Sequence, residues 1–175
     1  MKKISLAVVG FVTIGVLGLG KSVYAKETTA SVLVKSDGIK ISETKNITFN
    51  DVTVKKGVTT VIEKDKSSIT IEDLRGSSSQ GWTLTAKLND ENFKGMRLNF
   101  TPKIESNATV AQAGSSVDLN YQPQTIATVA DTDIKTTDFD TNVSLNGKLT
   151  VPEKQLATTY TTTIVWNLAE GPGTI

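Results

Sequence analysis

The stretch Tyr160-Thr-Thr-Thr-Ile-Val-Trp166-Asn-Leu168-Ala-Glu-Gly-Pro172 decides the fold class of this 175-residue chain. A β-strand has a two-residue period, which places alternate residues on one face: Tyr160, Thr162, Ile164, Trp166 and Leu168. Threonine, β-branched and aromatic residues fit a pleated surface, and Pro172 ends the pattern because proline has no N–H to donate. The stretch therefore predicts a strand that turns one face toward a core.

A second stretch, Gly81-Trp82-Thr-Leu84-Thr-Ala-Lys-Leu88, has the same form, with Trp82, Leu84, Ala86 and Leu88 on one face. The chain has two tryptophans, and each of them precedes a leucine by two residues. An indole buries on the order of 200 Å², so the pair fits two core anchors that face each other across a sandwich. The pattern is equally compatible with an exposed indole that stacks on sugar rings. Such a platform would draw its neighbours from Tyr160, Asn167, Thr83 and Thr85.

The two motifs carry a resemblance. Gly81-Trp82-Thr83-Leu84, followed at a distance by Tyr160-x5-Trp166-Asn167-Leu168-x3-Pro172, resembles the WxL domain of Gram-positive surface proteins. The resemblance covers most of the chain after its first 25 residues. A lone W-x-L tripeptide is unspecific, but two of them, the second with its tyrosine, its trailing proline and its position near the C-terminus, form a specific combination.

This resemblance implies a secreted protein that attaches non-covalently to the cell wall through peptidoglycan. It also implies site residues by carry-over of the motifs, which are Trp82, Leu84, Trp166, Leu168, Tyr160 and Pro172. These residues fit either of two roles, contact with the ligand or construction of the core. The alternative function is a protein-interaction subunit, held at the wall by a membrane-anchored partner or by another WxL protein.

The first 25 residues are typical of a secretion signal. Lys2 and Lys3 precede the apolar run of residues 4–19, and Ala25 follows Val-Tyr as a small residue suited to cleavage. A retained membrane anchor is the alternative, although the run is short for a span of roughly 20 apolar residues. We expect residues 26–175 to form one domain, because about 150 residues can bury a sizeable core.

Composition excludes several kinds of chemistry. The chain has no cysteine and no histidine, which removes disulfides, cysteine nucleophiles, Ser-His-Asp triads and the commonest zinc ligands. Of 19 basic and 18 acidic side chains, three basic ones lie in the expected signal, which leaves a net charge of about −2. The sequence shows no basic patch, so a nucleic-acid partner is not expected.

The remaining chain predicts an all-β fold, a single sandwich of short, mainly antiparallel strands with little helix. Apolar alternation between turn residues predicts strands at 31–34, 47–49, 52–54, 58–62, 68–72, 96–100, 142–145 and 148–151. Asn146-Gly147 predicts a two-residue hairpin that joins the last two of these strands. The small-residue runs between 108 and 130 fit edge strands or loops, and residues 127–130 and 155–157 fit single turns of helix.

The sequence offers candidates for two kinds of catalytic or metal site. Asp131-Thr-Asp133 and Asp138-Phe-Asp140 offer alternating carboxylates to calcium, but they lack the glycine and closing glutamate of a calcium loop, and aspartate is a common turn former. No pair among the glutamates stands out as a glycosidase acid and nucleophile. We therefore expect no cofactor and no enzymatic activity.

Overall fold

The computed structural model describes residues 30–76, 80–89, 93–106, 110–130 and 139–171. The chain divides into two units, Met1–Ser36 and Asp37–Ile175. In the first unit, residues 30–36 form neither helix nor strand, so the predicted strand at 31–34 is wrong. Within these described ranges no helix has the length and apolarity needed to cross a membrane.

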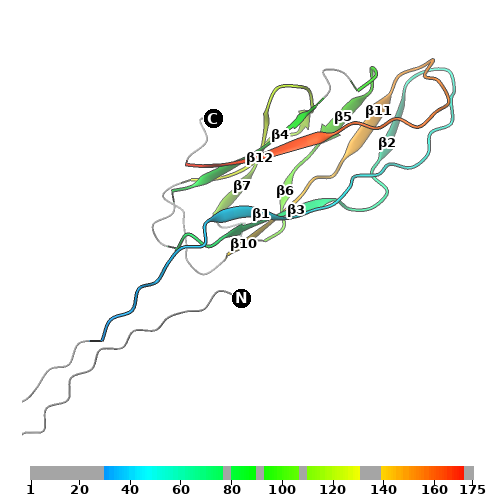
Figure 1. Cartoon of the computed structure of the whole chain (residues 1–175). Helices are drawn as coiled ribbons and strands as arrows, with labels where there is room; N and C mark the ends of the chain where they lie inside the picture. The colour runs from blue at the N-terminus through cyan, green and yellow to red at the C-terminus, as the bar shows by residue number, and fades with distance from the viewer. Residues whose placement is uncertain (1–29, 77–79, 90–92, 107–109, 131–138, 172–175) are drawn as a thin grey trace, which may run out of the picture. The chain divides into compact units, whose positions relative to one another are not determined.

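The second unit is all-β, as predicted, and its strands pair antiparallel in three sheets (Figure 1). What we call the motif sheet contains, in spatial order, β12 (Ile164–Glu170), β4 (Trp82–Leu88), β9 (Gln124–Val129) and β7 (Ala111–Ala113). The facing sheet contains β1 (Ile39–Thr44), β3 (Ser68–Asp73), β10 (Asp140–Ser144) and β6 (Lys103–Ile104). The end sheet contains β2 (Thr59–Ile62), β11 (Lys148–Val151), β5 (Arg97–Phe100) and β8 (Val117–Asp118).

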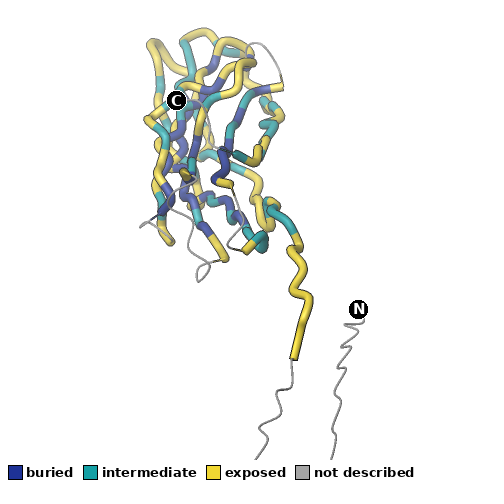
Figure 2. The backbone as a smooth tube through the Cα atoms, turned by 90° about the vertical axis from the view of Figure 1, so that its left-hand side faces the viewer, coloured by how far each residue is buried: buried dark blue, intermediate teal, exposed yellow. Residues whose placement is uncertain are grey.

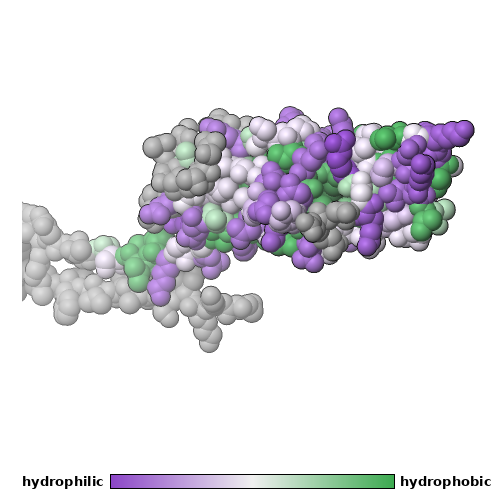
Figure 3. Space-filling model, turned by 90° about the horizontal axis from the view of Figure 1, so that it is seen from above, coloured by the Kyte–Doolittle hydropathy of each residue, from purple (hydrophilic) through white to green (hydrophobic). Residues whose placement is uncertain are grey.

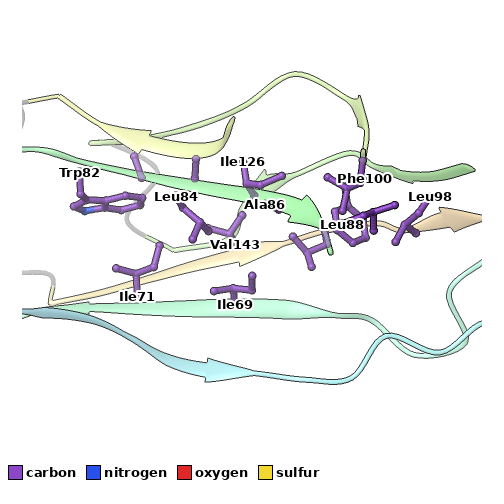
Figure 4. Close-up of a cluster of buried hydrophobic side chains, with 14 of the residues drawn as sticks. Ile69, Ile71, Trp82, Leu84, Ala86, Leu88, Leu98, Phe100, Ile126 and Val143 are labelled. Atoms are coloured by element: carbon purple, nitrogen blue, oxygen red, sulfur yellow. The ribbon is translucent and has the colours of Figure 1, made fainter. Parts of the chain in front are cut away.

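The core lies between the motif sheet and the facing sheet. Figure 4 shows Trp82 and Leu84 of β4 and Ile126 of β9 pointing toward Ile71 and Val143. All five side chains are at most 2% exposed. The alternation on β4 is as predicted, because Trp82, Leu84, Ala86 and Leu88 are all buried. Figure 2 shows the buried residues along the strands, whereas many of the connecting loops are exposed.

The end sheet continues the facing sheet past a shared bend. Three chain segments cross from one sheet to the other there, at residues 63–67, 101–102 and 145–147. Backbone hydrogen bonds join the crossings: the Leu145 N–H donates to the Ser67 carbonyl at 3.1 Å, and the Thr101 N–H donates to the Leu145 carbonyl at 2.9 Å. The motif sheet covers the facing sheet. The end sheet extends beyond the motif sheet (Figure 1).

The hairpin predicted at Asn146-Gly147 is wrong. β10 pairs with β3 and β6 in one sheet, whereas β11 pairs with β2 and β5 in another. A type I′ turn needs positive φ at both central residues, but only Asn146 has it, at 48°. Gly147 also lies in a tight place, because a Cβ there would lie 3.4 Å from the Phe100 ring and 3.3 Å from a Glu63 carboxylate oxygen.

Of the other predicted strands, five are confirmed and two are wrong. Strands predicted at 58–62, 68–72, 96–100, 142–145 and 148–151 are confirmed to within a few residues. Those at 47–49 and 52–54 are wrong, since residues 45–58 form a long loop with one isolated bridge, between Phe49 and Glu63. Residues 127–129 lie in β9 and residues 155–157 are not helical, so both suggested helical turns are wrong.

Candidate functional site

A groove of about 910 Å³ lies at the end-sheet side of the domain. Its apolar surface comes from β5, β11 and the residues just before β5, with Leu98, Leu149, Phe93 and Met96 each at most 8% exposed. Residues of β2 and β12 add to the lining, and most of the remainder comes from two segments, residues 44–55 and residues 152–163. We call these the first wall and the second wall. The groove exists because no sheet covers the end sheet as the motif sheet covers the facing sheet.

Both walls are rich in hydroxyl and amide side chains. The first wall offers Thr44, Asn46, Thr48, Asn50 and Thr53, and the second offers Gln155, Thr158, Thr159, Thr161, Thr162 and Thr163. Most of these residues are exposed. Exposed apolar side chains lie among them, with Val54 at 52% and Leu156 at 77% exposure. Figure 3 shows hydrophobic and hydrophilic residues interspersed over the face seen from above.

The second Trp-x-Leu motif reaches this groove. Trp166 is partly exposed and lines it, and its ring stacks on the fully buried Phe100 with centroids 6.0 Å apart and planes inclined by 13°. Tyr160 also lines the groove, and its hydroxyl donates a hydrogen bond to the Leu156 carbonyl at 3.0 Å. This bond closes a short turn of the second wall. An indole and a phenol thus lie on the same groove, between hydroxyl-bearing neighbours.

The first motif has different surroundings. Trp82 is 2% exposed and Leu84 is fully buried, so neither offers a surface to a ligand. The two motifs lie on neighbouring antiparallel strands, with Leu84 directly opposite Leu168 and Trp166 opposite Ala86. Leu168 is partly buried and packs against the core. The sixth motif residue, Pro172, lies outside the described residues.

An arginine side chain binds the backbone just before Trp82. The Arg75 side chain, 8% exposed, donates two hydrogen bonds to the Asp73 carboxylate, from Nε at 2.9 Å and from Nη2 at 2.8 Å. It also donates to the carbonyls of Gln80 and Gly81 at 3.0 and 3.2 Å. Burial opposes ionisation of Asp73, but the hydrogen bonds and charge of Arg75 outweigh it and lower the pKa of this carboxyl. Arg75 therefore fixes the chain that enters β4.

No cluster of three or more potential metal ligands occurs among the described residues. The two acidic sequences considered for calcium are not decided by this, because Asp131, Asp133 and Asp138 lie outside the described ranges. Asp140 begins β10 and is exposed.

Much of the groove was missed by the sequence analysis. The first wall was assigned to strands, and Tyr160 to Thr163 were assigned to the strand that in fact begins at Ile164. Arg75 lies outside every stretch of alternating apolar residues, so the sequence pattern did not single it out. The one feature that could have indicated the walls is the concentration of threonine and asparagine in residues 44–53 and 158–163.

An all-β domain with an open groove, apolar at its base and polar at its walls, has the architecture of a binding module. A family model for the WxL domain, described as a surface cell wall-binding domain, matches residues 35–172. The chain therefore belongs to the WxL family, and it is a cell-surface protein associated with the cell wall. A search of curated proteins found no match to it.

Proposed function

We propose that this protein attaches to the cell wall by binding peptidoglycan directly in the groove between the two walls. The observation that carries the proposal is the position of Trp166 and Tyr160 on one groove, among exposed threonines and asparagines. Sugar rings stack their apolar faces on indole and phenol, and hydroxyl and amide groups orient sugar hydroxyls and acetamido groups by hydrogen bonding. No catalytic step is required.

In this proposal the motif residues have two roles. Trp82, Leu84 and Leu168 build the core and the pairing of β4 with β12, whereas Trp166 and Tyr160 line the binding surface. We also propose that residues 1–25 are a signal peptide removed on secretion, so that the mature protein begins at Lys26. N-terminal sequencing of the secreted protein tests this boundary, with Lys26 as the expected first residue.

The test of direct binding is co-sedimentation of residues 26–175 with peptidoglycan freed of proteins and teichoic acids. The double variant Asn50→Ala/Thr161→Ala removes one exposed polar group from each wall. A lost hydrogen bond costs about 0.5–1.5 kcal/mol, so we expect roughly tenfold weaker binding.

A matched control carries Asn167→Ala/Thr125→Ala, which removes the same groups at exposed positions outside the groove. Equal loss in both variants would contradict the groove as the site. Wild-type protein that stays in solution would contradict direct binding altogether.

A second candidate function is supported by β12, which lies at the edge of the motif sheet and pairs only with β4 among the described strands. An exposed edge can accept a strand from another protein. In this candidate a membrane-anchored partner or another WxL protein holds the domain at the wall. Retention on cells that carry the partner, without retention on purified peptidoglycan, would favour it.

A further inference from the structure

Lysines extend from both walls of the groove. Lys45 and Lys55 belong to the first wall and Lys154 to the second, and all three are exposed. Among the described residues that line the groove, Asp51 is the single carboxylate, and Glu153 of the second wall lies beside Lys154, so the three lysines exceed the nearby carboxylates by one. The groove is therefore locally positive, although the chain after residue 25 carries a net charge of about −2.

These lysines have weak partners or none. In the described part of the chain, Lys45 and Lys55 form no ion pair, and Lys154 lies 4.0 Å from its neighbour Glu153 with 87% of its side chain exposed. Two lysines elsewhere in the described chain have close partners, since Lys40 lies 2.6 Å from Glu72 and Lys103 lies 3.1 Å from Glu105. An exposed pair at 4.0 Å contributes little, so the three ammonium groups remain able to bind an anion.

The backbone at Lys154 has an unusual conformation. Its φ is 65°, a left-handed conformation that side-chain-bearing residues rarely adopt. The next residue, Gln155, donates a hydrogen bond from Nε2 to the Lys94 carbonyl at 3.0 Å, which ties this part of the wall to the segment before β5. Lys154 lies in a turn, and the hydrogen bond of Gln155 helps to fix the place from which its side chain leaves the wall.

We propose that Lys45, Lys55 and Lys154 bind carboxylates of the peptide stems of peptidoglycan, so that the groove selects a carboxylate-bearing glycan over a neutral one. This inference rests on the proposed function and adds its specificity. A lysine ammonium is a mobile point charge on a long stem and does not require one fixed carboxylate geometry. That property suits a polymer whose peptide stems vary in position along the groove.

The experiment compares two insoluble polymers by co-sedimentation: peptidoglycan stripped of teichoic acids and proteins, and chitin, a neutral polymer of N-acetylglucosamine. The tested variant is Lys45→Gln/Lys55→Gln/Lys154→Gln. A control variant removes the same charge from exposed lysines outside the groove, at Lys64, Lys66 and Lys148. Both variants must match the wild-type unfolding midpoint.

We expect the groove variant to bind peptidoglycan about tenfold more weakly, as three exposed charge pairs would give, and the control variant to bind within twofold of wild type. Wild type should prefer peptidoglycan to chitin, and raising salt from 0.05 to 0.5 M should reduce that preference because salt screens exposed charges. A groove variant that binds like wild type would overturn the inference and leave the proposed function standing. Wild-type protein that binds neither polymer would overturn both.

Binding only to walls that still carry teichoic acid would also overturn the inference, because it would assign the charge recognition to phosphate groups.

Discussion

The two tryptophans lie in regions that differ in how far one sheet covers another. Trp82 lies between two sheets that cover each other, and it is 2% exposed. Trp166 lies where the end sheet extends beyond the motif sheet, and one buried ring, Phe100, supports it while the groove opens beside it. The same Trp-x-Leu pattern thus serves the core in one strand and a surface in the next. Sheet coverage, not the motif, decides which role each indole has.

The largest expected effect belongs to Trp82. Replacing it with alanine removes a fully packed indole, so Trp82→Ala should lower the free energy of unfolding by about 3–5 kcal/mol. That is a large part of the roughly 5–15 kcal/mol typical of a domain. Urea unfolding followed by circular dichroism measures it. A loss below about 1 kcal/mol would contradict the assignment of Trp82 to the core.

The next largest loss of stability is expected when Arg75 is replaced, because its side chain joins Asp73 to the backbone that leads into β4. Arg75→Leu removes the ion pair with Asp73 and the hydrogen bonds to the two carbonyls before β4, and should cost about 2 kcal/mol. A double-mutant cycle with Asp73→Asn isolates the pair. Additive losses would contradict a direct interaction.

A smaller loss is expected at Trp166. Trp166→Leu keeps an apolar side chain over Phe100 but removes the ring stacking, which should cost about 1–2 kcal/mol. The same variant should lose most of its binding to peptidoglycan at a temperature where it is fully folded. A folded Trp166→Leu protein that binds like wild type would remove the indole from the binding surface.

The smallest effect is a dependence on pH. The folded-state pKa of Asp73 lies below its unfolded value, so the stability it contributes is complete above about pH 4 and is lost as the pH falls through the folded pKa. The difference in unfolding free energy between wild type and Arg75→Leu should be constant from pH 7 to pH 5 and decrease below pH 4. Unfolding midpoints across this range measure it. A difference that grows in acid would contradict the ion pair.

The sequence predicted the covered region well, and for a physical reason. β4 alternates Trp82, Leu84, Ala86 and Leu88 inward because one face of the strand is buried, and burial on one face produces a two-residue period that can be read directly. The same reasoning located β3 and β5.

The groove region was predicted poorly because its walls do not pair. Ile47, Phe49 and Val52 are half-buried and β-branched or aromatic, so their local pattern resembles a strand, but among the described residues their pairing does not extend beyond the single bridge between Phe49 and Glu63. The hairpin at Asn146-Gly147 failed for a related reason. Its two flanking segments find better partners in different sheets, a long-range outcome that the turn residues do not determine.

The two indole N–H signals test the central claim most directly, because Trp82 is buried in the core whereas Trp166 lines the groove. We would add soluble peptidoglycan fragments to isotopically labelled residues 26–175 and follow both signals by NMR. The account predicts that the Trp166 signal shifts with the fragments, together with amides of residues 44–55 and 156–163, while the Trp82 signal stays in place. Shifts confined to residues outside the groove, with an unchanged Trp166 signal, would contradict it.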